Sequence, residues 1–136
     1  MRFVDTSVLL YAISRDPAEQ AQAAEANRVL SSRDLVLSVQ VLQEFYVQAT
    51  RDGGAARLTH DQAAGLMESF RRFPVQEATV GLALAAADCA QRFQISYWDA
   101  AIIEAARLLE CEIVLSADLL DDHDYGDVRV INPFSR

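Results

Sequence analysis

The sequence predicts an α/β fold, in which a mostly parallel central β-sheet carries helices on both faces. Short apolar runs, typical of strands buried on both faces, alternate with longer segments whose apolar residues recur at helical spacing. Helix-capping residues stand between these segments. The 136 residues include only five Gly and three Pro, and no repeat or linker interrupts them, so residues 1–136 are expected to form a single domain.

The first strand and helix are predicted at the N-terminus. Residues 3–4 form a short apolar strand that ends at Asp5, and apolar side chains then recur with helical spacing over residues 8–12. The Asp-Pro pair at residues 16–17 supplies an N-cap and a proline at the first helical position. A second helix is therefore expected to run to about residue 30.

The same alternation continues through the middle of the chain. Residues 35–37 form a buried type of strand, and Ser38 then caps a helix that runs from residue 39 to about residue 50. An Asp-Gly-Gly sequence at residues 52–54 interrupts the chain. These signals predict a second strand followed by a third helix.

Two further helices and a short third strand are predicted next. Either residue of the pair at 59–60 can cap a helix that continues through Phe73, and residues 74–76 form the strand. Thr79 is expected to cap the following helix, which ends near Phe93.

The last part of the chain predicts one helix and two strands. Ser96 and Asp99 fit a capping box that opens a helix to about residue 110. Residues 113–115 and 128–131 are apolar strands. Four aromatic residues are expected to pack in the core: Phe45, Tyr46, Tyr97 and Trp98.

Composition excludes several functional classes. All twelve Lys and Arg residues are arginines, and the absence of lysine excludes a P-loop nucleotide site, a Schiff-base enzyme and a phospho-receiver domain. The net charge of −8 argues against broad non-specific affinity for nucleic acid.

Cys89 and Cys111 form no metal-ligand pattern and are expected to be buried free thiols. We find neither a signal peptide nor a membrane span, so we expect a cytoplasmic protein without a membrane partner.

Four acids from separated parts of the chain are expected to meet at the carboxyl end of the sheet, where such sheets bind ligands. Asp5 follows the first strand directly, and Asp118 lies just past the strand at residues 113–115. Asp99 heads the apolar stripe of its helix, and Glu44 borders the apolar face of another. These positions predict one cluster of carboxylates.

Such a cluster needs compensating positive charge. Two carboxylates ~4 Å apart repel each other by roughly 4 kcal/mol at an effective dielectric constant of about 20. Lysine is absent and the sequence indicates no arginine nearby, so the alternatives are raised pKa values or a hard divalent cation. Oxygen ligands favour Mg²⁺ or Mn²⁺, and such a metal suits the cleavage of phosphodiesters.

Each acid also has a structural explanation when it is taken alone. Asp99 fits a capping box, and Asp5 fits a cap or turn at the end of a strand. Glu44 fits the solvated face of a helix, and Asp118 fits a hydrated loop that is rich in aspartate. Only their combination indicates a metal site.

Four segments together resemble PIN-domain proteins, particularly the VapC toxins of bacterial toxin–antitoxin pairs. They are residues 4–11, Glu44, residues 97–102 and residues 115–119, and the similarity covers essentially the whole chain in order and spacing. The resemblance implies a three-layer PIN-like fold, Mg²⁺- or Mn²⁺-dependent endoribonuclease activity, homodimers and neutralisation by a cognate antitoxin.

The resemblance also implies roles for individual residues. The catalytic, metal-binding acids would be Asp5, Glu44, Asp99 and Asp118. Small hydroxyl residues at motif positions would support them: Thr6, Ser7 and Ser116. Ala117 stands where many such toxins carry another acid, which leaves open whether Asp121 supplements the cluster.

The partners implied are an RNA substrate and a basic antitoxin tail near the active site, which the acidity of the chain would suit. Five arginines are candidates for RNA contacts: Arg51, Arg57, Arg71, Arg72 and Arg92. Two alternatives stay open. One is a catalytically silent PIN-like domain that binds a partner protein or RNA, and the other is a phosphatase, which the missing DxDxT motif at Asp5 disfavours.

Overall fold

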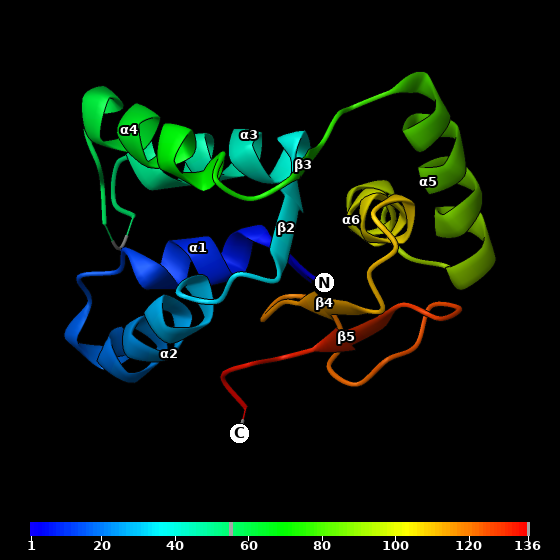
Figure 1. The fold of residues 1–136 in the computed structure, drawn as a ribbon. Helices are drawn as coiled ribbons and strands as arrows, with labels where there is room; N and C mark the ends of the chain where they lie inside the picture. Colours follow the sequence, from blue (N-terminus) through cyan, green and yellow to red (C-terminus); the bar gives the residue numbers. More distant parts are fainter. Residues whose placement is uncertain (55, 136) are drawn as a thin grey trace.

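A five-stranded parallel sheet forms the centre of the computed structural model, which describes residues 1–54 and 56–135 (Figure 1). The strand order is β3-β2-β1-β4-β5, so the first strand of the chain is the middle strand of the sheet. Arg2 of β1 pairs with Leu35 of β2 on one side and with Ile113 of β4 on the other. The strands are β1 (Arg2–Val4), β2 (Leu35–Ser38), β3 (Val75–Gln76), β4 (Ile113–Leu115) and β5 (Arg129–Ile131).

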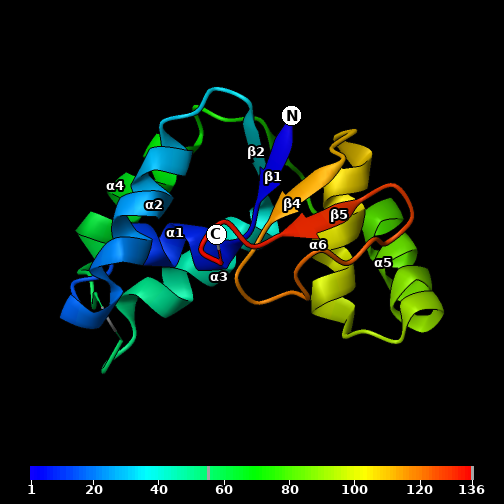
Figure 2. The ribbon, with the colours of Figure 1, turned by 90° about the horizontal axis from the view of Figure 1, so that it is seen from below.

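Helices cover both faces of the sheet and make three layers, as predicted (Figures 1 and 2). One layer contains α1 (Thr6–Ala12), the 3₁₀ helix η1 (Pro17–Glu19), α2 (Gln20–Leu30), α3 (Val39–Thr50) and α4 (His60–Phe70). The other contains α5 (Val80–Phe93) and α6 (Tyr97–Leu108), which pack against each other. The central strands are buried between the layers, and Phe3, Val36 and Val114 are fully inaccessible to solvent.

The predicted helices are present, with differences at some ends. The residues after Pro17 form a 3₁₀ turn before α2 begins, with Asp16 accepting a hydrogen bond from the backbone N–H of Ala18. α4 ends at Phe70, earlier than predicted, and the next three N–H groups donate to carbonyl oxygens three residues back, in tighter turns that lead toward β3. Pro74 disfavours helical backbone at Phe73.

The prediction that the aromatic residues pack in the core is wrong for Trp98. Phe45 is buried, and Tyr46 is partly buried with its hydroxyl 2.9 Å from Nδ1 of His60. The side chain of Trp98, in contrast, is 64% exposed. It lies in the first turn of α6, before the buried stripe of that helix begins at Ala100.

Two other expectations concern the cysteines and the membrane. Cys89 and Cys111 are buried free thiols, as predicted. Over residues 1–54 and 56–135, no helix has the length and apolar character that crossing a bilayer requires.

Candidate active site at the carboxyl edge of the sheet

Asp5 lies at the end of the middle strand, where the backbone leaves the sheet and enters α1. Its backbone N–H still donates to the carbonyl oxygen of Leu115 in β4, at 3.0 Å. Its carboxylate accepts hydrogen bonds from the backbone N–H of Thr6 and from the hydroxyl of Ser116, both at 2.7 Å. The residue is only 6% exposed, so two neighbouring elements hold this carboxylate in a nearly water-free position.

Ser116 links Asp5 to Asp118. Its hydroxyl donates to Asp5 and accepts from the backbone N–H groups of Asp118 and Leu119, at 3.1 and 3.2 Å. A second hydroxyl, that of Ser7, accepts a hydrogen bond from the N–H of Ala117 at 3.0 Å. The turn after β4 is therefore fixed to the start of α1, and this fixes where the backbone of Asp118 lies.

Glu44 reaches the same edge from α3. Its helix begins directly after β2, and the capping hydroxyl of Ser38 accepts from the N–H of Val41. Glu44 is partly buried, and its carboxylate accepts a hydrogen bond of 2.9 Å from the hydroxyl of Thr6. Thr6 therefore binds both carboxylates, because its backbone N–H donates to Asp5 and its hydroxyl donates to Glu44.

Asp99 stands in the first turn of α6 with an exposed side chain. Its backbone N–H donates to the hydroxyl of Ser96, so Ser96 caps the helix as predicted. The reciprocal bond of a capping box, from the N–H of Ser96 to the carboxylate of Asp99, is absent from the described hydrogen bonds. The carboxylate is thus not used to cap the helix.

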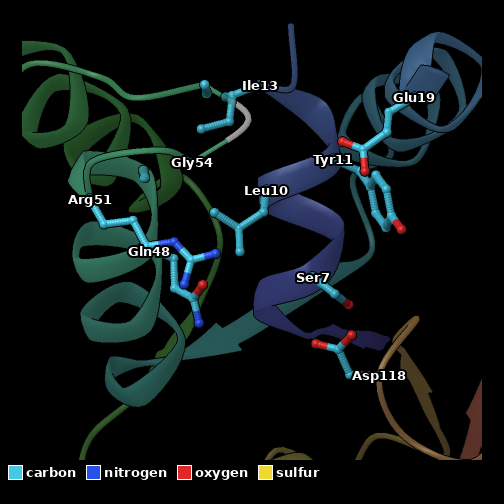
Figure 3. Close-up of a pocket in the computed structure, with 11 residues that line it drawn as sticks. Ser7, Leu10, Tyr11, Ile13, Glu19, Gln48, Arg51, Gly54 and Asp118 are labelled. Atoms are coloured by element: carbon cyan, nitrogen blue, oxygen red, sulfur yellow. The ribbon is translucent and has the colours of Figure 1, made fainter. Parts of the chain in front are cut away.

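The electrostatics connect these four acids. The pKa of Asp5 is raised to about 6, mainly by burial and to a smaller extent by the charges of Asp118 and Glu44, against the opposing hydrogen bonds from Ser116 and Thr6. The pKa of Asp118 is also raised, by partial removal from water and by the charge of Asp99. The surface of Asp118 is accessible to solvent, but the residue lines a pocket (Figure 3). The atoms around the pocket displace part of the water near its carboxylate, which accounts for the effect of burial on its pKa.

A profile of the PIN-domain family matches residues 2–119, a span that includes all four acids. The chain belongs to the PIN-domain family. No curated protein sequence matches the chain significantly.

Solved structures share the fold of this PIN domain at low sequence identity. A toxin–antitoxin complex from Klebsiella pneumoniae has a TM-score of 0.70 and 18% identity over 98% of each chain. Mycobacterium tuberculosis VapC20, described as a toxin that cleaves the sarcin–ricin loop, has a TM-score of 0.66 and 22% identity over 87% of this chain and 90% of its own. FitAcB from Neisseria gonorrhoeae has a TM-score of 0.65 and 20% identity over 98% and 99% of the respective chains. The PIN-like fold predicted from the sequence is confirmed.

The carboxylates of this PIN domain have the donor chemistry that a magnesium ion requires, without a closed cage. No three His, Cys, Asp or Glu side chains in the described parts of the chain lie close enough together to enclose a metal ion. Mg²⁺ usually takes only one or two protein carboxylates and keeps several waters. The carboxylates of Asp99 and Asp118 accept no hydrogen bond from any described residue, so their oxygens are available as ligands. This donor set fits the ion.

Asp121, whose part in the cluster the sequence left open, faces another segment. One of its carboxylate oxygens accepts from the N–H of Asn132 at 2.7 Å, and the other lies 3.2 Å from the hydroxyl of Ser135. These contacts hold the C-terminal turn.

The sequence indicates no arginine near the acids, but the structure places one in the pocket beside Asp118. Arg51 lines a pocket that also contains Ser7 and Asp118, and Figure 3 shows its side chain reaching from the end of α3 toward α1. From the sequence, Arg51 is only one of five arginines that are candidates for RNA contacts. Its position depends on how the end of α3 packs beside α1, and periodicity does not report contacts between distant segments.

Proposed function

We propose that this PIN domain is a Mg²⁺-dependent endoribonuclease and the toxin component of a VapBC-type toxin–antitoxin pair. One observation carries the proposal. The pKa of Asp5, at the centre of the sheet edge, is raised first by burial and then by the charges of Asp118 and Glu44, and no side-chain cation contacts this carboxylate among the described residues. A divalent cation would relieve that repulsion, and PIN-family membership supports nuclease chemistry.

In this proposal the acids Asp5, Glu44, Asp99 and Asp118 hold the metal, which is Mg²⁺ or Mn²⁺. When it is bound, the ion supplies the positive charge that activates a water and neutralises the phosphate during hydrolysis of the RNA phosphodiester. The chain itself orients the ligands. Ser116 and the N–H of Thr6 hold the carboxylate of Asp5, and the hydroxyl of Thr6 holds that of Glu44, so neither carboxylate must reorganise at the moment of reaction.

The proposed partners are a cognate antitoxin, an RNA substrate and a second copy of the chain in a homodimer. The antitoxin is supported by the structures that share the fold, one of which is described as a toxin–antitoxin complex. The net charge of −8 supports a basic antitoxin segment, because an acidic surface attracts it.

The activity is tested on purified, antitoxin-free protein with total cellular RNA. We expect cleavage with Mg²⁺ or Mn²⁺ and none with excess EDTA. Asp5→Asn and Asp99→Asn are expected to lose cleavage, whereas Asp88→Asn, an exposed aspartate on α5, is expected to keep it. Circular dichroism verifies that each variant is folded.

Three results would contradict the proposal. Cleavage that survives EDTA, or that survives both site substitutions, excludes the metal mechanism. A folded wild-type protein that binds RNA but never cuts it supports the silent-domain alternative. Turnover of nitrophenyl phosphate without RNA cleavage supports the phosphatase alternative.

A further inference from the structure

A pocket of about 270 Å³ adjoins the acid cluster, between α1 and the end of α3 (Figure 3). Ser7 and Asp118 lie at one end of it. Leu10 of α1 forms an apolar wall, and the side chains of Gln48 and Arg51 reach toward it from α3. The volume lies just below the roughly 300–1,000 Å³ of pockets that hold drug-sized ligands. The pocket therefore has room for one small unit of a larger substrate.

The charge of Arg51 is available for a ligand. Six other arginines form salt bridges with carboxylates: Arg2, Arg28, Arg57, Arg71, Arg107 and Arg129. The guanidinium of Arg51 makes neither an ion pair nor a hydrogen bond in the described chain, where only the backbone carbonyl of this residue accepts a bond, and no other arginine lines this pocket. The other charged residues that line the pocket are Asp118 and Glu19, so among its described residues the unpaired guanidinium is the place where an anionic group of a ligand is attracted.

We propose that this pocket is a nucleotide subsite, in which Arg51 binds the backbone phosphate next to the one that is cut and Gln48 contacts the base. The inference rests on the proposed ribonuclease function and deepens it. A guanidinium can bind two phosphate oxygens at once, and a glutamine amide both donates and accepts hydrogen bonds, as a base edge requires. Leu10 supplies the apolar surface against which the base or sugar packs.

The positions of these groups around the pocket support RNA as the occupant. Asp118 joins the pocket to the carboxylates that would act on the scissile phosphate, and Arg51 and Gln48 lie across the pocket from it, on the α3 side (Figure 3). A polynucleotide carries a phosphate at every residue. A chain whose reacting phosphate lies at the acids therefore presents its next phosphate along the pocket, where the acids alone would repel it and Arg51 attracts it.

Binding of a fluorescein-labelled RNA hexamer, measured by anisotropy in EDTA so that the RNA stays intact, tests the subsite across a series of salt concentrations. Arg51→Gln is expected to weaken binding at least about tenfold at low salt and to reduce the slope of log K against log salt by about 0.7, the share of one phosphate contact. Arg51→Lys keeps the charge and is expected to keep the slope.

Arg33→Gln is the matched control. Arg33 is also exposed and without an ion pair in the described chain, but it precedes β2 and so lies at the opposite end of the sheet. Arg33→Gln changes the net charge of the protein by the same amount as Arg51→Gln, and we expect it to bind RNA with wild-type affinity and slope. If Arg51→Gln behaves like Arg33→Gln, the subsite inference is wrong. If a glutamate hexapeptide displaces the RNA as well as unlabelled RNA does, the pocket binds an acidic peptide and the inference is also overturned.

Cleavage kinetics with Mg²⁺ separate this inference from the proposed function. With an oligonucleotide substrate, Arg51→Gln is expected to raise KM at least about tenfold and to change kcat little, because Arg51 binds substrate away from the reacting bond. A wild-type protein that cleaves RNA, with an unchanged KM in Arg51→Gln, refutes the subsite alone. A wild-type protein that neither binds nor cleaves RNA refutes both.

Discussion

Replacing Asp5 by asparagine is expected to stabilise the metal-free protein at alkaline pH while abolishing its activity. The carboxylate of Asp5 is buried, with its pKa raised from 3.8 to about 6, so its charged form destabilises the fold. Asparagine has nearly the same shape and no charge. Its carbonyl oxygen can still accept the hydrogen bond from the N–H of Thr6.

The magnitude follows from linkage between protonation and folding. A carboxyl whose pKa is raised by folding stabilises the protein below its unfolded value, near 3.8, and that stability is lost as the pH rises through about 6. At about 1.36 kcal/mol per pKa unit, ionised Asp5 costs about 3 kcal/mol at pH 8 and about 1.5 kcal/mol at pH 5. The amide of asparagine would face the hydroxyl of Ser116, which already accepts two N–H groups, and this costs about 1 kcal/mol at either pH.

Urea denaturation in EDTA measures the difference in free energy of unfolding. We expect Asp5→Asn to be more stable than wild type by about 2 kcal/mol at pH 8 and by about 0.5 kcal/mol at pH 5. Other titrating groups are common to both proteins and cancel in the comparison. A difference that does not change with pH, or a variant that is less stable at pH 8, would refute the assignment of a buried, charged Asp5.

Three other substitutions test the contacts around the acids. Ser116→Ala leaves two backbone N–H groups and one carboxylate oxygen without their partner, and should lower the free energy of unfolding in urea by about 2–3 kcal/mol; a loss under about 0.5 kcal/mol would contradict its linking role. Thr6→Val removes the bond to Glu44, and should cost about 1 kcal/mol and lower kcat with KM unchanged; an unaltered kcat would show that Glu44 needs no such support. Ser96→Ala removes the N-cap of α6, for a loss of about 1 kcal/mol in the same urea assay; equal stability would disprove the cap.

Most of the fold was predictable because its signals are local. At Ser38, Thr59, Thr79 and Ser96, a side-chain hydroxyl accepts a hydrogen bond from a backbone N–H in the first turn of a helix, as the predicted caps require. These bonds join residues three positions apart, and the apolar runs of the strands are equally short in sequence. Such patterns can be recognised without the path of the chain.

The contacts of the site were less predictable because they join distant segments. Thr6 and Glu44 are 38 positions apart, and Asp5 and Ser116 are 111 apart. Strand order in a parallel sheet predicts that these residues share an edge, but not which hydroxyl meets which carboxylate. The pocket position of Arg51 likewise depends on how α3 packs beside α1, and the exposure of Trp98 depends on where the buried stripe of α6 begins.

Proton release on metal binding tests most directly whether the acid cluster is a metal site. Mg²⁺ binds the ionised carboxylate, so at pH 6, where Asp5 is about half protonated, binding should release about half a proton per protein, and almost none at pH 8. Calorimetric titration in buffers of different ionisation enthalpy measures this number. We predict that release in wild type and a smaller one in Asp5→Asn, where Asp118, whose pKa is also raised, is the remaining source. No Mg²⁺ binding, or binding at pH 6 without proton release, would contradict the account.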